Sequence, residues 1–179
     1  MNRKSMSGFT LIEVMIVVVI ISVLVGIAIP DIISWLPKYR LKNATRDLVS
    51  FMQKTKMEAV KNNSSLEIIF NSSSSPGFYY LDSDEDSSWD VGEERLFLGD
   101  YKSGIDYGSG SASKNWDDES ISKVISFPSA LLRFSARGMS NSWGTVFLEN
   151  KNSDICFAIT VLATGSINVR EWTGTTWTD

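Results

Sequence analysis

The hydrophobic residues form three successive patterns, and the first is a continuous apolar run over residues 9–29. Of its 21 residues, only four are not strongly apolar: Thr10, Glu13, Ser22 and Gly26. At 1.5 Å of rise per residue, a helix of this length measures about 31 Å and can cross the hydrocarbon core of a bilayer. The run therefore predicts a transmembrane helix.

The second pattern, over residues 30–62, is that of an amphipathic helix. Apolar or small side chains recur at spacings of three and four, with Met52 and Val60 beside them: Leu41, Ala44, Leu48, Phe51, Thr55 and Ala59. Basic side chains occupy much of the opposite surface: Lys38, Arg40, Lys42, Arg46, Lys54 and Lys61. We expect kinks at Pro30 and Pro37, because proline lacks an amide donor and crowds the preceding turn. The asparagine pair 62–63 ends the element.

The third pattern, from residue 63 onward, is that of short strands rich in β-branched and aromatic residues. Strands are predicted at 65–70, 78–81, 95–101, 122–127, 145–150, 155–162 and 166–172. Residues 102–120 predict a mobile surface loop or an irregular edge segment. The fold expected is α+β, a long N-terminal helix whose second half packs on an antiparallel β-sheet or β-sandwich head.

Charge and residue usage narrow the function classes. Residues 30–62 carry seven Lys/Arg and three Asp/Glu, net +4, and residues 63–179 carry eight and seventeen, net −9. The basic segment could attract anionic lipid, whereas the acidic head would repel nucleic acid. The chain has no histidine, which removes Ser-His-Asp and Cys-His sites and favours a protein that is not an enzyme. Cys156, the one cysteine, is predicted to be a buried free thiol in a central strand.

The start of the chain predicts its topology. Arg3 and Lys4 precede the apolar run, which places the N-terminus in the cytoplasm by the positive-inside rule. A cleaved secretory signal fits less well, because its apolar core is shorter and ends in a small-residue site. Glu13 lies within the run, where a carboxylate costs about 2.5–3.5 kcal/mol at a helix centre, so it requires a partner.

The segment Gly8-Phe9-Thr10-Leu11-Ile12-Glu13, after a short basic leader, resembles the N-terminus of type IV pilins and type II secretion pseudopilins. The resemblance implies that residues 1–8 are a leader. A prepilin peptidase would cleave between Gly8 and Phe9 and methylate the new amine of Phe9. It also implies that Glu13 pairs with the N-terminal amine of a neighbouring subunit during assembly.

Residues 48–63, the segment 134–141 and the closing strand–Ala-Thr-Gly–strand hairpin resemble the GspH/FimT-like minor pilins and pseudopilins. This implies a structural subunit anchored once in the bacterial inner membrane, with residues 63–179 as a periplasmic head. Its partners would be other pilin subunits in a type IV pilus or a type II secretion pseudopilus, besides the peptidase and membrane lipid.

The alternative is a DNA-uptake or adhesive minor pilin that binds a ligand through the head. Some FimT-like members bind DNA through a Gly-Arg-x-Arg motif near the last strand. Here the corresponding residues are 165–168, Gly-Ser-Ile-Asn, with Arg170 as the nearby charge. Nucleic acid is therefore not the partner expected.

An acidic segment offers a candidate metal site. Carboxylates occupy positions 1, 3, 5, 9 and 12 of a twelve-residue loop, the spacing of an EF-hand calcium loop: Asp82, Asp84, Asp86, Asp90 and Glu93. Ser87 stands at position 6, where an EF-hand has glycine, and the flanks predict strands rather than helices. A calcium site and a solvated acidic turn both remain open.

Overall fold

The computed structural model describes residues 9–102 and 104–178, which form two compact units, one up to Leu36 and one from Pro37 onward. The predicted leader 1–8, including Gly8, lies outside the described residues. Each unit is considered by itself, although one helix, α1 (Leu11–Asn62), contributes to both. The helix is continuous through Pro30 and Pro37, so neither proline ends it.

The N-terminal unit contains the first part of α1, whose apolar side chains are exposed on all sides. Residues Leu11–Ile29 have a mean hydropathy of 3.1 with none of the segment buried, and are long and apolar enough to span a membrane. A helix that is apolar all round requires a non-aqueous surrounding, because no single face can be covered by one packing partner.

The second part of α1 packs on the head, as the predicted stripe requires. All six stripe residues are buried, and so is Met52. Val60 is the exception, since it is exposed. The edge-to-face contact of Phe51 with Tyr79, at 5.2 Å between ring centroids, attaches the helix to one sheet. Lys56 Nζ donates to the Gly165 carbonyl at 2.8 Å, beside the other sheet.

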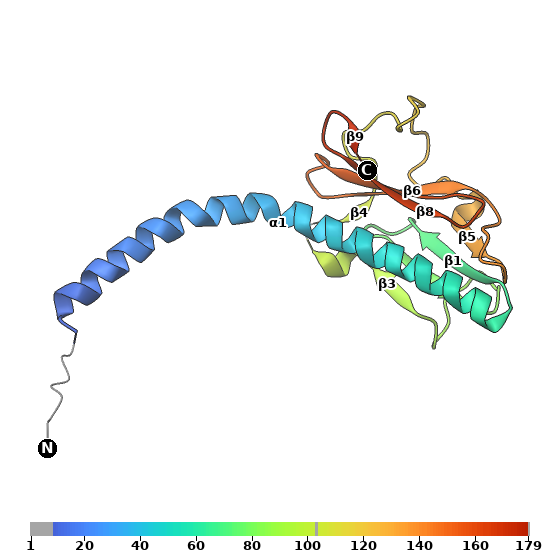
Figure 1. The fold of residues 1–179 in the computed structure, drawn as a ribbon, viewed down its shortest axis with the longest axis horizontal. Helices are drawn as coiled ribbons and strands as arrows, with labels where there is room; N and C mark the ends of the chain where they lie inside the picture. Colours follow the sequence, from blue (N-terminus) through green and yellow to red (C-terminus); the bar gives the residue numbers. More distant parts are fainter. Residues whose placement is uncertain (1–8, 103, 179) are drawn as a thin grey trace, which may run out of the picture. The chain divides into compact units, whose positions relative to one another are not determined.

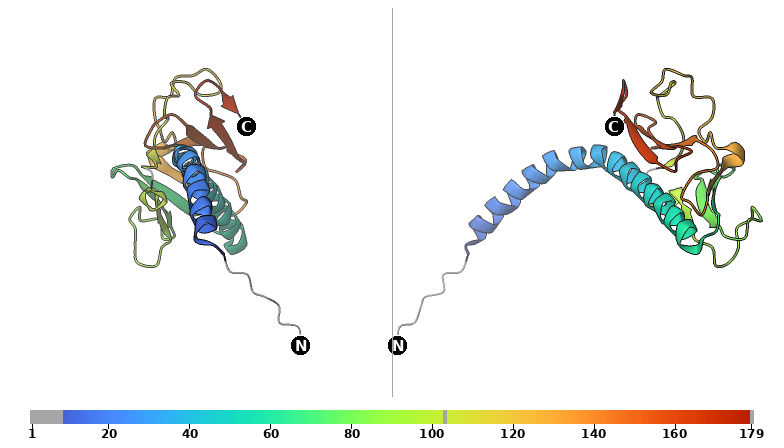
Figure 2. Two further views of the ribbon diagram at one scale, coloured as in Figure 1. Left: turned by 90° about the vertical axis from the view of Figure 1, so that its left-hand side faces the viewer. Right: turned by 45° about the vertical axis from the view of Figure 1, so that its right-hand side comes forward.

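The head contains two antiparallel sheets (Figures 1 and 2). The first has the order β3-β2-β1-β5, formed by β1 (Leu66–Asn71), β2 (Phe78–Asp82), β3 (Arg95–Phe97) and β5 (Leu131–Phe134). The second has the order β4-β6-β7-β8-β9, formed by β4 (Asp106–Tyr107), β6 (Gly144–Glu149), β7 (Cys156–Val161), β8 (Ile167–Trp172) and β9 (Trp177–Thr178). Two short 3-10 helices, η1 (Leu98–Tyr101) and η2 (Pro128–Ala130), lie between strands. The α+β architecture is the one predicted.

Apolar residues of both sheets and of α1 form one core. Phe70 of β1 stacks on Phe127 at 5.6 Å and meets Tyr107 of β4 edge-on at 6.4 Å, which joins the sheets. Cys156 is a buried free thiol in the central strand β7, as predicted. Burial, and then the nearby Glu149 carboxylate, raise the pKa of Cys156 to about 12.

Two strand predictions are wrong. Residues 122–127 form no named strand, although Phe147 N donates to the Val124 carbonyl and Ser126 N to the Thr145 carbonyl, each at 2.9 Å. This segment continues the edge of β6 beyond the two-residue strand β4, with one isolated bridge and no ladder. The predicted strand 95–101 ends at Phe97, because the chain turns there into η1.

Candidate functional site

The N-terminal end of α1 contains the predicted assembly residue, Glu13. Thr10 precedes the first helical residue, and its amide and hydroxyl both donate to Glu13 Oε2 at 2.8 Å. The Glu13 amide donates in turn to Thr10 Oγ1 at 3.3 Å. Together these bonds form a capping box, in which each residue satisfies an amide that the helix leaves without a partner.

This capping box gives the carboxylate a partner within its own chain. The sequence pattern Thr-x-x-Glu at residues 10–13 is the signature of such a box, but sequence reasoning considered only the cost of the charge and its pairing with a neighbouring subunit. Both bonds that the carboxylate accepts fall on Oε2. The predicted pairing with a neighbouring subunit's amine stays a prediction, as does cleavage at Gly8, which is not among the described residues. Phe9 is almost fully exposed immediately before the box.

The acidic loop after β2 brings three of its five predicted ligands together. Asp82, Asp84 and Asp86 each offer a carboxylate oxygen within 4.8 Å of the others. Asp82 is fully buried and accepts the amides of Glu85 and Ser87, both at 2.8 Å. It therefore has a role in holding the loop whether or not a cation binds.

The other two predicted ligands, Asp90 and Glu93, do not join this group. Glu93 instead accepts the amides of Ser83 at 2.7 Å and Asp90 at 3.2 Å, which closes the base of the loop. Ser87 adopts φ +63°, the left-handed conformation for which an EF-hand uses glycine at this position.

Several carboxylates crowd together in the acidic loop, and this contributes to the shifted pKa of Asp84. Desolvation, and then the charge of Asp86, raise the pKa of Asp84. Three convergent oxygens on a loop are a partial set for calcium, which takes six to eight oxygen ligands. The calcium site stays a prediction.

The head also contains a groove that sequence reasoning missed. Its cavity measures about 730 Å³, and it lies between the loop before residue 123 and the second sheet. The available signal was the distribution of tryptophan, because four of the six tryptophans lie after residue 115: Trp116, Trp143, Trp172 and Trp177. The first two line the groove. Sequence reasoning assigned residues up to 120 to a loop and gave these aromatic residues no role.

Comparison with known proteins yields two family matches. The model of the prokaryotic N-terminal methylation motif matches residues 3–29, and that of the type II transport protein GspH matches residues 44–165. Among solved structures, the type IV minor pilin FimU of Pseudomonas aeruginosa superposes with a TM-score of 0.49 at 13% identity. That alignment covers 74% of this chain and 89% of FimU. No curated protein sequence matches significantly.

Proposed function

Because the chain belongs to the type II transport protein GspH family, we propose that it is made as a prepilin, cleaved between Gly8 and Phe9 and methylated on the Phe9 amine. It is a structural subunit of the minor pilin or pseudopilin class, with a methylation motif at its N-terminus and a GspH domain after it. Subunits of this class assemble with other pilin subunits. Its anchor is proposed to cross the bacterial inner membrane once, with the head in the periplasm.

The single observation that carries this proposal is the exposure of the first part of α1. Its large apolar side chains from Leu11 to Ile29 are uncovered within the chain. Burying apolar surface is worth roughly 25 cal/mol per Å², so such a segment associates with lipid or with other apolar helices. A subunit that moves from a membrane into a filament uses both of these surroundings.

The capping box allows a specific role for Glu13 in that transfer. The amine released at Phe9 would have an ordinary pKa near 7.7–8.0 and be mostly cationic at neutral pH. A neighbour's ammonium could approach the carboxylate at Oε1, since both capping bonds use Oε2. Pairing lowers the cost of an ionised group in an apolar surrounding, so this contact favours association.

Processing is tested with Gly8→Arg in the full chain, expressed with its native partner subunits. We expect the variant to retain residues 1–8, whereas the wild-type protein loses them and gains one methyl group at Phe9. Intact-mass measurement of the membrane-extracted protein distinguishes the two. Wild-type protein that assembles with the leader still attached would contradict the proposal.

Assembly is tested with a matched pair of variants, Glu13→Gln and Glu13→Val. Glutamine removes the charge but can still complete a capping box, whereas valine removes both functions. If the charge pairs with a neighbour, both variants co-purify with far fewer partner subunits, while membrane insertion and leader removal stay near normal. Normal assembly of Glu13→Gln, with loss in Glu13→Val, would assign the residue to helix capping alone.

A further inference from the structure

The groove in the head has its floor on the outward face of the second sheet. Register places Thr145 opposite Thr160 and Thr160 opposite Asn168, and places Phe147, Ala158 and Arg170 in the next row. These residues share one face, because side chains two residues apart point to the same side of a strand. The opposite face carries Ile159 and Val161, which belong to the core.

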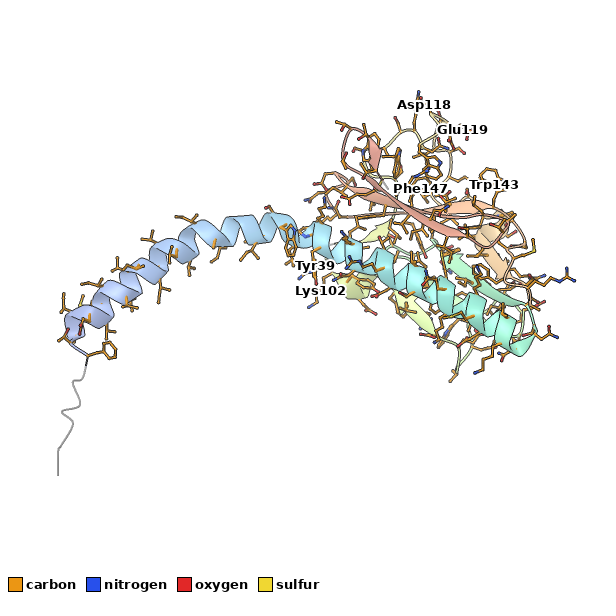
Figure 3. All side chains as sticks on the ribbon, viewed as in Figure 1. Tyr39, Lys102, Asp118, Glu119, Trp143 and Phe147 are labelled. Atoms are coloured by element: carbon orange, nitrogen blue, oxygen red, sulfur yellow. The ribbon has the colours of Figure 1, made fainter. Side chains whose placement is uncertain are left out.

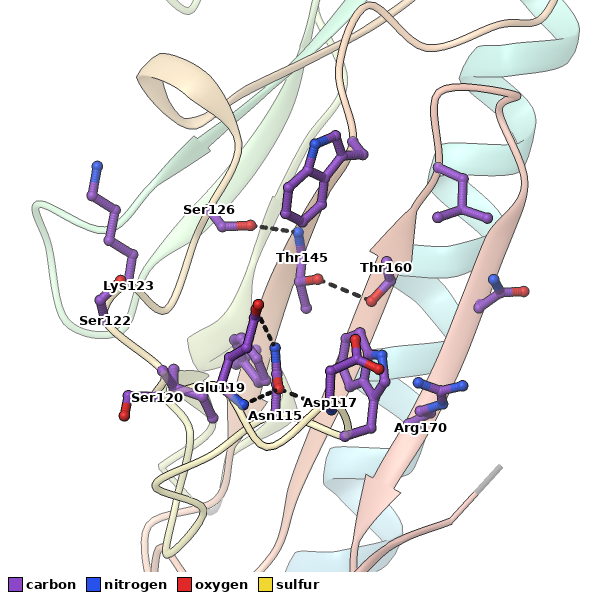
Figure 4. A pocket seen from close by; sticks show the side chains of 16 residues that line it. Asn115, Asp117, Glu119, Ser120, Ser122, Lys123, Ser126, Thr145, Thr160 and Arg170 are labelled. Carbon is purple, nitrogen blue, oxygen red and sulfur yellow. Dashed lines mark hydrogen bonds between the residues drawn. The ribbon is translucent and has the colours of Figure 1, made fainter.

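The floor combines hydroxyls held by hydrogen bonds with the apolar side chains of Phe147 and Leu162. The hydroxyls of Thr145 and Thr160 are 2.9 Å apart across the strands, and Thr145 N donates to Ser126 Oγ at 2.7 Å (Figure 4). β7 pairs with β6 on one side and β8 on the other. An incoming chain therefore cannot add to β7, so recognition over the centre of the floor uses side chains. β9 covers only Glu171 and Trp172 on the outer edge of β8.

The wall of the groove is a loop held by hydrogen bonds within itself and by one to β9. Asn115 Oδ1 accepts the amides of Asp117 and Glu119 at 2.9 Å, and Asn115 N donates to the Glu119 carbonyl at 2.9 Å. Trp177 Nε1 of β9 donates to the Lys114 carbonyl at 2.8 Å. Of the two alternatives predicted for residues 102–120, a mobile surface loop or an irregular edge segment, these contacts and the edge strand β4 fit the second.

Aromatic rings lie along the same groove. Trp116 packs edge-on against Trp177 at 6.0 Å, and the Arg170 guanidinium lies over the Trp116 ring at 4.6 Å. Trp143 lines the groove beside β6, yet its side chain is 69% exposed. Figure 3 shows Trp143 on the same side of the head as Glu119. An exposed indole next to a built cavity is an unused flat apolar surface.

The charged groups of the groove balance one another. Asp117 and Glu119 carry negative charge, and Lys123 and Arg170 carry positive charge, all four from its lining (Figure 4). Between them stand hydroxyl and amide groups that can both donate and accept hydrogen bonds. The cavity of about 730 Å³ falls within the range of roughly 300–1,000 Å³ typical of small-ligand sites.

We propose that this groove binds an uncharged oligosaccharide. The apolar C–H face of a sugar ring fits an exposed indole, and its hydroxyls match a lining of carboxylates, amides and hydroxyls that offers both donors and acceptors. Nucleic acid fits poorly, because binding it requires a net positive lining and the groove has none. A peptide strand cannot pair with β7, the central strand of the floor, because both of its edges are occupied. This inference goes beyond the assembly role. A failure of sugar binding would leave the assembly role standing, and a failure of assembly would leave the sugar site standing.

The test uses the full chain in a detergent without a sugar head group, such as lauryldimethylamine oxide. The probes are cellotetraose, maltotetraose and tetra-N-acetylchitotetraose, each titrated to about 10 mM and followed by saturation-transfer NMR and tryptophan fluorescence. We expect at least one to bind, with roughly tenfold weaker affinity in Trp143→Ala and in Asp117→Ala. Trp89→Ala, which removes an indole stacked on Arg95 beside the other sheet, is the matched control and should bind as wild type.

Three results would overturn the proposal. One is that none of the three sugars binds to protein whose near-ultraviolet circular dichroism shows a folded head. The second is binding that Trp143→Ala and Asp117→Ala leave unchanged, since the sugar would then lie elsewhere. The third is that oligothymidylate or a tetrapeptide binds the protein and none of the three sugars displaces it. Loss of binding in both groove variants, with the thermal midpoint of the head unchanged and Trp89→Ala unaffected, supports it.

Discussion

The two halves of α1 differ in what surrounds them, although they belong to one helix. In the first half, Leu11–Ile29, apolar residues cover every side and none of the segment is buried. In the second half, apolar residues are confined to a stripe, and Leu41, Ala44 and Leu48 are fully buried in the head. The stripe matches one packing surface, whereas the all-round pattern requires an apolar medium.

The comparison shows that burial within one chain does not measure how important an apolar residue is. Val18 and Leu24 are exposed, so their contribution depends on lipid or on other subunits. Leu48 contributes to the folding of the head itself. Substitutions of the same kind in the two halves should therefore affect different measurements.

The largest effect on stability is expected from Leu48→Ala. Truncating a fully buried leucine leaves a cavity in the core and typically costs about 2–5 kcal/mol of unfolding free energy. Leu24→Ala, the matched change in the exposed half, should leave the stability of the head unchanged. Denaturant unfolding of the full chain in detergent, followed by tryptophan fluorescence, compares them. Equal destabilisation by the two variants would contradict the division between the halves.

A lysine introduced into each half of α1 tests whether lipid or water surrounds that half. Val18 and Met57 are exposed to similar extents, 56% and 65%. Val18→Lys should cost about 2.5–3.5 kcal/mol of membrane insertion, whereas Met57→Lys should change stability by less than about 0.5 kcal/mol. Alkaline carbonate extraction of membranes measures the inserted fraction. If Val18→Lys stays fully inserted, the first half is not in the hydrocarbon core.

Alkaline pH should lower the stability of the head and leave the first half of α1 helical. Burial raises the pKa of Cys156 from 9.0 to about 12, and it also raises the pKa of Tyr79 and Tyr107. Above pH 9 the unfolded chain releases protons that the folded head keeps. Stability is therefore full below pH 9 and falls as the pH rises toward 12, by about 1.4 kcal/mol per unit for each fully shifted group.

Near-ultraviolet circular dichroism of the full chain in denaturant, at pH steps from 8 to 11, measures this loss. Cys156→Ala removes the contribution of the thiol and should make the decline shallower. Residues 9–36 contain no cysteine, tyrosine, lysine or arginine, so the helical signal of this part, read in the far ultraviolet, should persist. An unfolding free energy that is constant over this range would contradict the expected linkage.

Sequence predicted the helical parts more accurately than the strands. The spacing of Leu41, Ala44 and Leu48 identifies a buried face, because helical period and burial are both local properties of one segment. Val60 is exposed because it follows the fully buried Ala59 by one residue and is therefore turned about 100° away from the buried face. The strand Leu131–Phe134 was missed as a strand because pairing with β1 is a long-range property that four residues do not reveal.

Functional residues in a contiguous motif were likewise easier to predict than those that the fold brings together. Phe9 and Glu13 belong to a contiguous motif, so resemblance alone marks them. The groove combines residues from β6, β7, β8 and a loop, which the sheet register brings together from positions 115 to 170. Single-sequence patterns do not contain that register, and the aromatic content of the segment was the only local signal.

The smallest effect is expected in the acidic loop, which belongs to the head alone. Desolvation, and then the neighbouring carboxylates, raise the pKa of Asp84, and calcium bound at Asp82, Asp84 and Asp86 would neutralise those carboxylates. For a millimolar site, a few millimolar calcium should add about 1 kcal/mol to the stability of the head, or about 2–4 °C. Insertion of the first half of α1 should not respond. Differential scanning calorimetry in calcium and in EGTA measures the shift.

The variant that isolates the cation is Asp84→Asn rather than any change at Asp82. Asp82 accepts two backbone amides inside the folded loop, so its loss would destabilise the head even without calcium. Asp84→Asn removes one ligand charge while also relieving repulsion from Asp86, so the apo protein should be as stable as wild type or slightly more stable. Its calcium response should disappear, whereas Asp118→Asn, an exposed carboxylate of the groove loop, should retain it. Equal midpoints in calcium and EGTA for the wild-type protein would instead assign the segment to a solvated acidic turn, closed by Glu93 and held by Asp82.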